Sequence, residues 1–168
     1  MGICNKEYFI NKISNNGKSK VFDKKDYIFR DVNPDGNCGY RALAVQLYCN
    51  ENYYSNIRDN IYNYININKD QYKNLNFEFN GKFITIDEYV EKINIDGTWM
   101  GDLELSVINI LYDAVLLIYE LRYDNKLILL SIYGDILDNN KFILNLCFVN
   151  GNHFNVLYEP DNNKTEFI

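Results

Sequence analysis

The chain shows two hydrophobic periodicities, one typical of helices and one typical of strands. From residue 39 to residue 49 nearly every position is apolar, and only Arg41 and Gln46 are strongly polar. A helix that is apolar almost all round lies buried among other elements. The segment therefore predicts a central helix, with the rest of the domain packed around it.

Three more helices are predicted downstream. The first is amphipathic, with apolar side chains recurring at helical spacing at Ile57, Ile61, Tyr64 and Ile65. Thr85 followed by Glu88 has the spacing of a capping box, which predicts that a second helix begins there. Asp102 can cap a third helix that continues to about Leu111.

After residue 113 the pattern changes to short runs rich in β-branched and large apolar residues. Four strands are predicted, at residues 114–120, 127–132, 142–149 and 154–158. Helices followed by an antiparallel meander indicate an α+β domain, in which the buried helix packs on a small antiparallel sheet. Residues 1–20 are polar and aperiodic and are interpreted as a flexible N-terminal arm, which leaves residues 21–168 as the single domain.

Composition argues against several classes of function. Lys+Arg 17 against Asp+Glu 23 gives a net charge of −6, so the chain lacks the basic surplus with which nucleic-acid-binding domains neutralise phosphates. No apolar run approaches the roughly 18 residues of a transmembrane helix, and Met1 is not followed by a signal segment. The four cysteines are therefore interpreted as cytosolic thiols. A single histidine and widely spaced cysteines argue against a metal site.

Cys38 combines two features that favour a reactive thiol. It directly follows the Asp-Gly-Asn loop 35–37 and precedes the buried helix, so it lies at or next to that helix's N-terminus. Unpaired amide N–H groups and the positive end of the helix dipole stabilise a thiolate there, and the same amides can bind an oxyanion. Cys49, on the interior of the predicted helix, and Cys147, in a predicted strand, are interpreted as packed thiols.

His153, the only histidine, follows a turn at residues 150–152 and precedes the strand 154–158. Because side chains alternate along a strand, His153 and Asn155 point to the same side. We expect the Asn155 amide oxygen to accept a hydrogen bond from one imidazole nitrogen and to leave the other facing a nucleophile. With Cys38, this arrangement would form a Cys-His-Asn triad.

Three segments carry a resemblance to a known family. Residues 35–42, Asp-Gly-Asn-Cys-Gly-Tyr-Arg-Ala, resemble the D-G-N-C-x-x-R-A signature of the ovarian tumour (OTU) cysteine proteases. Residues 152–156 resemble that family's C-terminal H-aromatic-N/D element, and residues 99–105 are similar to its middle block. The resemblance spans about residues 25 to 160 in the right order, although Gly39 stands where the family usually has a larger apolar residue.

The resemblance implies a papain-type cysteine protease fold and a deubiquitinase. Such an enzyme hydrolyses the isopeptide bond at the C-terminal glycine of ubiquitin through a thioester acyl-enzyme. Carried over by motif, Cys38 is the nucleophile, His153 is the general base and then the acid, and Asn155 orients His153. Asp35 is expected to hold the oxyanion loop. The expected oxyanion-hole donors are the backbone N–H groups of Gly36, Asn37 and Cys38.

The implied partners are ubiquitin and polyubiquitin chains, with a ubiquitin-like modifier as a further substrate and with no cofactor. We expect a monomer in the cytoplasm. Abundant Asn, Ile, Tyr, Lys and Phe indicate an A/T-rich genome, which suggests a pathogen protein that acts in the cytoplasm of an infected host cell. Two alternatives stay open, namely a module that binds ubiquitin without cleaving it and another thiol acyl-transfer enzyme with the same dyad.

Overall fold

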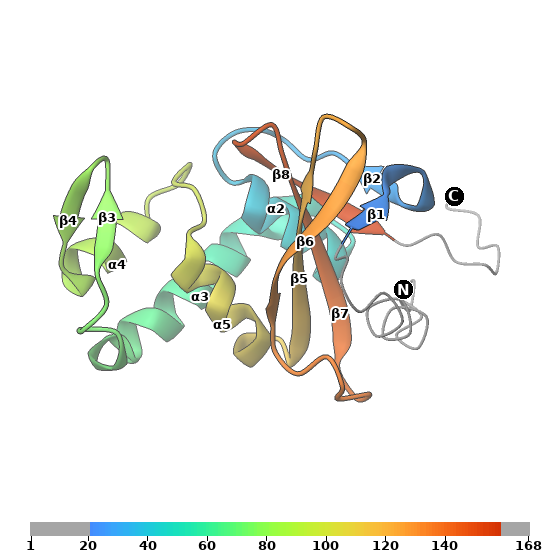
Figure 1. Ribbon diagram of the computed structural model, residues 1–168. Coiled ribbons are helices and arrows are strands. Elements are labelled where there is room, and N and C mark those ends of the chain that lie inside the picture. Colours follow the sequence, from blue (N-terminus) through green and yellow to red (C-terminus); the bar gives the residue numbers. More distant parts are fainter. Residues whose placement is uncertain (1–20, 159–168) are drawn as a thin grey trace.

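The computed structural model describes residues 21–158 and shows helices packed against a six-stranded sheet (Figure 1). The predicted N-terminal arm, residues 1–20, lies outside the described residues. The helices are α2 (Cys38–Tyr48), α3 (Tyr54–Ile67), α4 (Ile86–Ile93) and α5 (Asp102–Leu111), with 3-10 helices η1 (Lys24–Asp26), η2 (Glu51–Tyr53) and η3 (Lys69–Gln71). The strands are β1 (Val21–Asp23), β2 (Ile28–Arg30), β3 (Phe77–Phe79), β4 (Lys82–Ile84), β5 (Ala114–Leu121), β6 (Lys126–Tyr133), β7 (Phe142–Val149) and β8 (His153–Tyr158). Within residues 21–158, no helix has the length and apolar character needed to cross a membrane.

The main sheet is mixed, with strand order β1-β6-β5-β7-β8-β2. The α+β class is confirmed, but the predicted antiparallel meander is wrong, because β7 pairs with β5 in parallel instead of pairing with β6. The first six residues of β5 are all buried, which is typical of a central strand with neighbours on both edges. The short edge strands β1 and β2 and the separate hairpin β3–β4 were not predicted.

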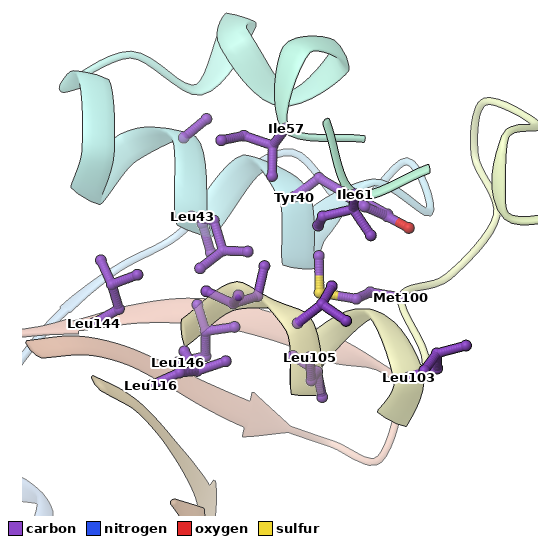
Figure 2. Close-up of a cluster of buried hydrophobic side chains, with 14 of the residues drawn as sticks. Tyr40, Leu43, Ile57, Ile61, Met100, Leu103, Leu105, Leu116, Leu144 and Leu146 are labelled. Carbon is purple, nitrogen blue, oxygen red and sulfur yellow. The ribbon is translucent and has the colours of Figure 1, made fainter. Parts of the chain in front are cut away.

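The sheet separates two clusters of buried side chains. Alternate residues of β5 point either to the helices or to the opposite face, where Phe22 and Tyr27 cover the second cluster. On the helix side, Leu43 of α2 lies near Leu144 and Leu146 of β7 (Figure 2). The helix α2 therefore lies at the centre of the domain, as its apolar sequence predicts.

The predicted helices are all present, with small changes at their ends. Residues 38–45 of α2 are buried, whereas Cys49 is exposed and adopts a left-handed conformation (φ 58°) that ends the helix. Its interpretation as a packed thiol is therefore wrong. Thr85 and Glu88 form the predicted capping box. The residue before α5 is Gly101, whose N–H donates to the Glu104 carboxylate over 3.2 Å, so Asp102 is not the cap but the first residue of the helix.

Candidate active site

Cys38 is the first residue of α2 and lies against β8, the last strand in the chain. Its side chain is largely covered, with the residue 6% exposed, and its Sγ accepts a hydrogen bond of 3.4 Å from the backbone N–H of Phe154. No side chain among the described residues caps α2, so the N–H groups of its first turn lie beside the sulfur without a capping partner. The N-terminal end of a helix stabilises negative charge that develops on a nearby group.

His153 is the first residue of β8 and directly precedes Phe154, whose backbone N–H contacts Cys38. Its Nε2 lies 2.9 Å from Oδ1 of Asp31. The expected hydrogen bond from the imidazole to Asn155 is absent among the described residues, because the Asn155 Oδ1 atom is buried there without a hydrogen-bond partner. The carboxylate of Asp31 takes the place predicted for the amide of Asn155.

Asp35 braces the loop in front of α2. Its carboxylate accepts hydrogen bonds from Nε (3.1 Å) and Nη2 (2.5 Å) of Arg41, and from the backbone N–H of Asn37 over 3.0 Å. The Arg41 guanidinium holds the pKa of the Asp35 carboxyl well below its usual range. These bonds support a loop-holding role for Asp35. They also occupy the Asn37 N–H, which corrects its assignment as an oxyanion donor and leaves the N–H groups of Gly36 and Cys38.

The same loop makes a close backbone contact with the segment before α5. Gly36 has φ +83°, and a Cβ atom there would lie 2.0 Å from the carbonyl oxygen of Gly97. Only glycine fits both the backbone conformation and the close approach. The N–H of Gly97 donates to Oδ1 of Asn37 over 3.0 Å, which ties the two segments together.

Arg58 of α3 stabilises this contact with its side chain. It was not identified from the sequence as a residue of the site. It is 4% exposed, and its guanidinium donates to Oδ1 of Asn37 (2.5 Å) and to the carbonyls of Ile93 and Thr98 (both 2.7 Å). It also lies over the ring of Tyr40, 3.9 Å from the ring centre. A signal was available, since Arg58 shares the buried helix face of Ile61 and Ile65, which follow it by three and seven residues.

A cavity of about 290 Å³ opens next to Cys38. Apolar and aromatic side chains dominate its lining, among them Trp99, Tyr133 and Phe154, and Asp102 contributes an exposed carboxylate. The cavity is therefore suited to an extended segment with apolar side chains and a nearby positive charge. Trp99, from the middle block of the sequence resemblance, is 58% exposed and belongs to this wall rather than to the core.

Two buried titratable side chains outside the site have structural roles. Burial raises the pKa of the Cys147 thiol to about 12, so it stays protonated, as its strand position predicts. Burial also raises the pKa of Glu104, which accepts a 2.6 Å hydrogen bond from the Tyr89 hydroxyl. Between residues 21 and 158, no group of three or more His, Cys, Asp or Glu side chains is placed to hold a metal ion.

The chain resembles proteins whose sequence or structure is known. A family model described as OTU-like cysteine protease matches residues 33–154. OTU domain-containing protein 4 of Homo sapiens is 27% identical over 129 residues, which make up 76% of this chain and 10% of the human protein. The OVARIAN TUMOR DOMAIN-containing deubiquitinating enzyme 7 of Arabidopsis thaliana is 35% identical over 75 residues, 45% of this chain and 19% of the plant protein. The chain thus spans about a tenth and a fifth of their lengths.

A solved structure shows the same fold. The Hazara virus OTU bound to ubiquitin superposes with a TM-score of 0.67 at 21% identity, covering 84% of this chain and 87% of that one. This likeness confirms the predicted fold.

Proposed function

Because the chain belongs to the family of OTU-like cysteine proteases, we propose that it is a deubiquitinase with Cys38 as nucleophile and His153 as general base. The observation that carries this proposal is the contact between Cys38, at the N-terminus of α2, and the first residues of β8. Because His153 directly precedes Phe154, this contact supports a pairing of the thiol at the helix N-terminus with the only histidine of the chain. This pairing activates a cysteine nucleophile.

The reaction follows from these positions. His153 takes the proton of Cys38, and the thiolate attacks the carbonyl carbon of ubiquitin's C-terminal glycine to form a C–S bond. The N–H groups of Gly36 and Cys38 stabilise the resulting oxyanion. Its collapse breaks the C–N bond, and the leaving lysine amine takes the proton from His153. His153 then deprotonates a water molecule, and the resulting hydroxide attacks the thioester carbonyl carbon. The C–S bond breaks, the ubiquitin carboxyl group is released, and His153 returns the proton to the Cys38 sulfur.

The cavity beside Cys38 supports ubiquitin as the substrate. The C-terminal tail of ubiquitin is extended and basic and ends in two glycines, so it suits a mainly apolar cavity with the Asp102 carboxylate at its wall. The ubiquitin-bound viral OTU supports the same substrate class. We extend the proposal to polyubiquitin chains and to a ubiquitin-like modifier, with the chain acting as a monomer.

The described cysteines, Cys38, Cys49 and Cys147, are all free thiols, which suits a reducing compartment. We therefore place the reaction in the cytoplasm. The abundance of residues with A/T-rich codons supports the cytoplasm of an infected host cell as the setting.

The proposal is tested by incubating the purified chain with isopeptide-linked diubiquitin of each linkage, with Cys38→Ala as the control. We expect monoubiquitin from at least one linkage and none with the variant. A chain that binds diubiquitin and leaves it intact would be a binding module. A chain that passes ubiquitin to an added amine in preference to water would be an acyltransferase. Either result would reject the proposed hydrolase.

A further inference from the structure

The pairing of β2 with β8 brings an acidic side chain beside His153. Arg30, the last residue of β2, lies opposite Val156 in the antiparallel register. Continued by one residue, this register places Asp31 opposite Asn155. Directly opposed residues of antiparallel strands share a face, and so do residues two apart along one strand. Asp31, Asn155 and His153 therefore point to the same side, where β2 runs beside β8 (Figure 1).

The imidazole of His153 thus has two possible oxygen acceptors, Asp31 and Asn155. Their hydrogen bonds show which of the two it contacts. Oδ1 of Asp31 lies 2.9 Å from Nε2 of His153 and also accepts the N–H of Val32 over 3.2 Å, which steadies the carboxylate. Oδ1 of Asn155 is buried without a hydrogen-bond partner among the described residues. The His153 side chain is 14% exposed and that of Asp31 is 80% exposed, so the pair lies at the rim of the site.

We infer that Asp31 is the positioning residue for His153, in place of Asn155. This inference rests on the proposed function, in which His153 removes the proton of Cys38. With Nε2 bonded to Asp31, the nitrogen left for that transfer is Nδ1. A carboxylate also stabilises the imidazolium that forms when the proton moves, because a charge-assisted hydrogen bond is stronger than one to a neutral amide.

The single histidine allows a direct spectroscopic test. The chain, prepared without a polyhistidine tag and labelled with 15N-histidine, gives ring signals from His153 alone. We expect the proton on Nε2 in the wild type, with a hydrogen-bonded shift. Asp31→Ala should remove that shift, and Asn155→Ala should keep the proton on Nε2. The opposite pattern, or no response to Asp31→Ala, would overturn the inference.

Kinetics on a fluorogenic ubiquitin substrate give the second readout. We expect Asp31→Ala to lower kcat at least about tenfold with KM little changed, because the imidazole loses its orientation while the substrate contacts remain. Asp31→Glu should restore part of kcat, and Asn155→Ala should lower kcat clearly less than Asp31→Ala does. Thermal unfolding of each variant controls for the fold.

The two readouts separate this inference from the proposed function. A wild-type chain that cleaves no ubiquitin conjugate, but whose His153 signal still depends on Asp31, would retain the positioning contact and reject the deubiquitinase. An active wild type in which Asn155→Ala, and not Asp31→Ala, lowers kcat would retain the deubiquitinase and reject Asp31.

Discussion

The backbone N–H of Phe154 donates a hydrogen bond to Sγ of Cys38 over 3.4 Å, although 116 residues separate the two in the chain. The bond fixes the sulfur against the start of β8 and supplies a donor that stabilises negative charge on it. Because His153 directly precedes Phe154, the same bond keeps the backbone of His153 close to the start of α2. The antiparallel pairing of β7 with β8 ends at the pair Val149 and His153 and so fixes the position of this end of β8 in the sheet.

Replacing Gly36 should damage the oxyanion loop. Gly36→Ala adds a Cβ atom 2.0 Å from the carbonyl oxygen of Gly97, in addition to the strain of a positive φ. Gly81→Ala is the matched control, since Gly81 has φ +75° with nothing within 4 Å. We expect Gly81→Ala to cost about 1 kcal/mol of unfolding free energy and to keep full activity. Gly36→Ala should cost more and abolish turnover, as measured by urea unfolding and ubiquitin hydrolysis. Equal effects would show that the contact with Gly97 is unimportant.

Arg58 should matter for acyl transfer more than for the thiol itself. Arg58→Met removes one of the two donors to Oδ1 of Asn37 and loosens the oxyanion loop. We expect kcat to fall about tenfold to a hundredfold, while alkylation of Cys38 by iodoacetamide, which forms no oxyanion, changes little.

Peptide mass distinguishes the alkylation of Cys38 from that of the exposed Cys49. Arg58→Lys should recover little, because an ammonium group cannot reach three acceptors as the guanidinium does. If alkylation and turnover fell by the same factor, Arg58 would act on Cys38 or on the fold as a whole.

The ion pair of Asp35 with Arg41 predicts a pH-dependent contribution to stability. The pKa of the Asp35 carboxyl is lowered in the folded state from its ordinary value of 3.8. The contribution is therefore fully present above about pH 4 and is lost as the pH falls toward the lowered pKa. We expect Asp35→Asn to cost about 1 kcal/mol at pH 7, with a gap that narrows below pH 4. Urea unfolding across pH 3 to 7 measures it, with Asp59→Asn on α3 as the charge control. A gap independent of pH would contradict the ion pair.

Substrate capture should depend on the carboxylate at the cavity. Asp102 is exposed at its wall, and under the proposed function its carboxylate would attract the arginines of the ubiquitin tail, an attraction that salt screens. We expect Asp102→Asn to raise KM for a ubiquitin substrate at low ionic strength and to have little effect at high salt. Asp59→Asn makes the same charge change on α3 and should have no effect. If both variants behaved alike, net charge and not the position of Asp102 would govern capture.

The sequence predicted the helices better than the sheet, for a physical reason. Helical spacing and capping are local, so α2, α3 and the capping box at Thr85 are readable from neighbouring residues. The parallel pairing of β5 with β7 and the three-residue strand β2 depend on partners far away in the chain. Asp31 could not be placed at the site without knowing that β2 pairs with β8.

The same contrast between local and distant contacts holds for the site. Cys38 lies at the start of α2 and contacts Phe154, the neighbour of His153, because each residue stands at the end of an element whose local sequence is clear. The predicted hydrogen bond between His153 and Asn155 is wrong. The carboxylate of Asp31 and the amide of Asn155 lie on one face of the sheet, and a carboxylate is the stronger acceptor for an imidazole N–H.

The most direct test uses a ubiquitin probe whose C-terminus carries a thiol-reactive warhead, read by intact and peptide mass. We predict one probe per chain on Cys38, with none on the exposed Cys49 or the buried Cys147, because Cys38 alone among these three described cysteines lies at a helix N-terminus. Labelling should disappear in Cys38→Ala and slow by several orders of magnitude in His153→Ala. Labelling that persisted in Cys38→Ala would contradict Cys38 as the nucleophile.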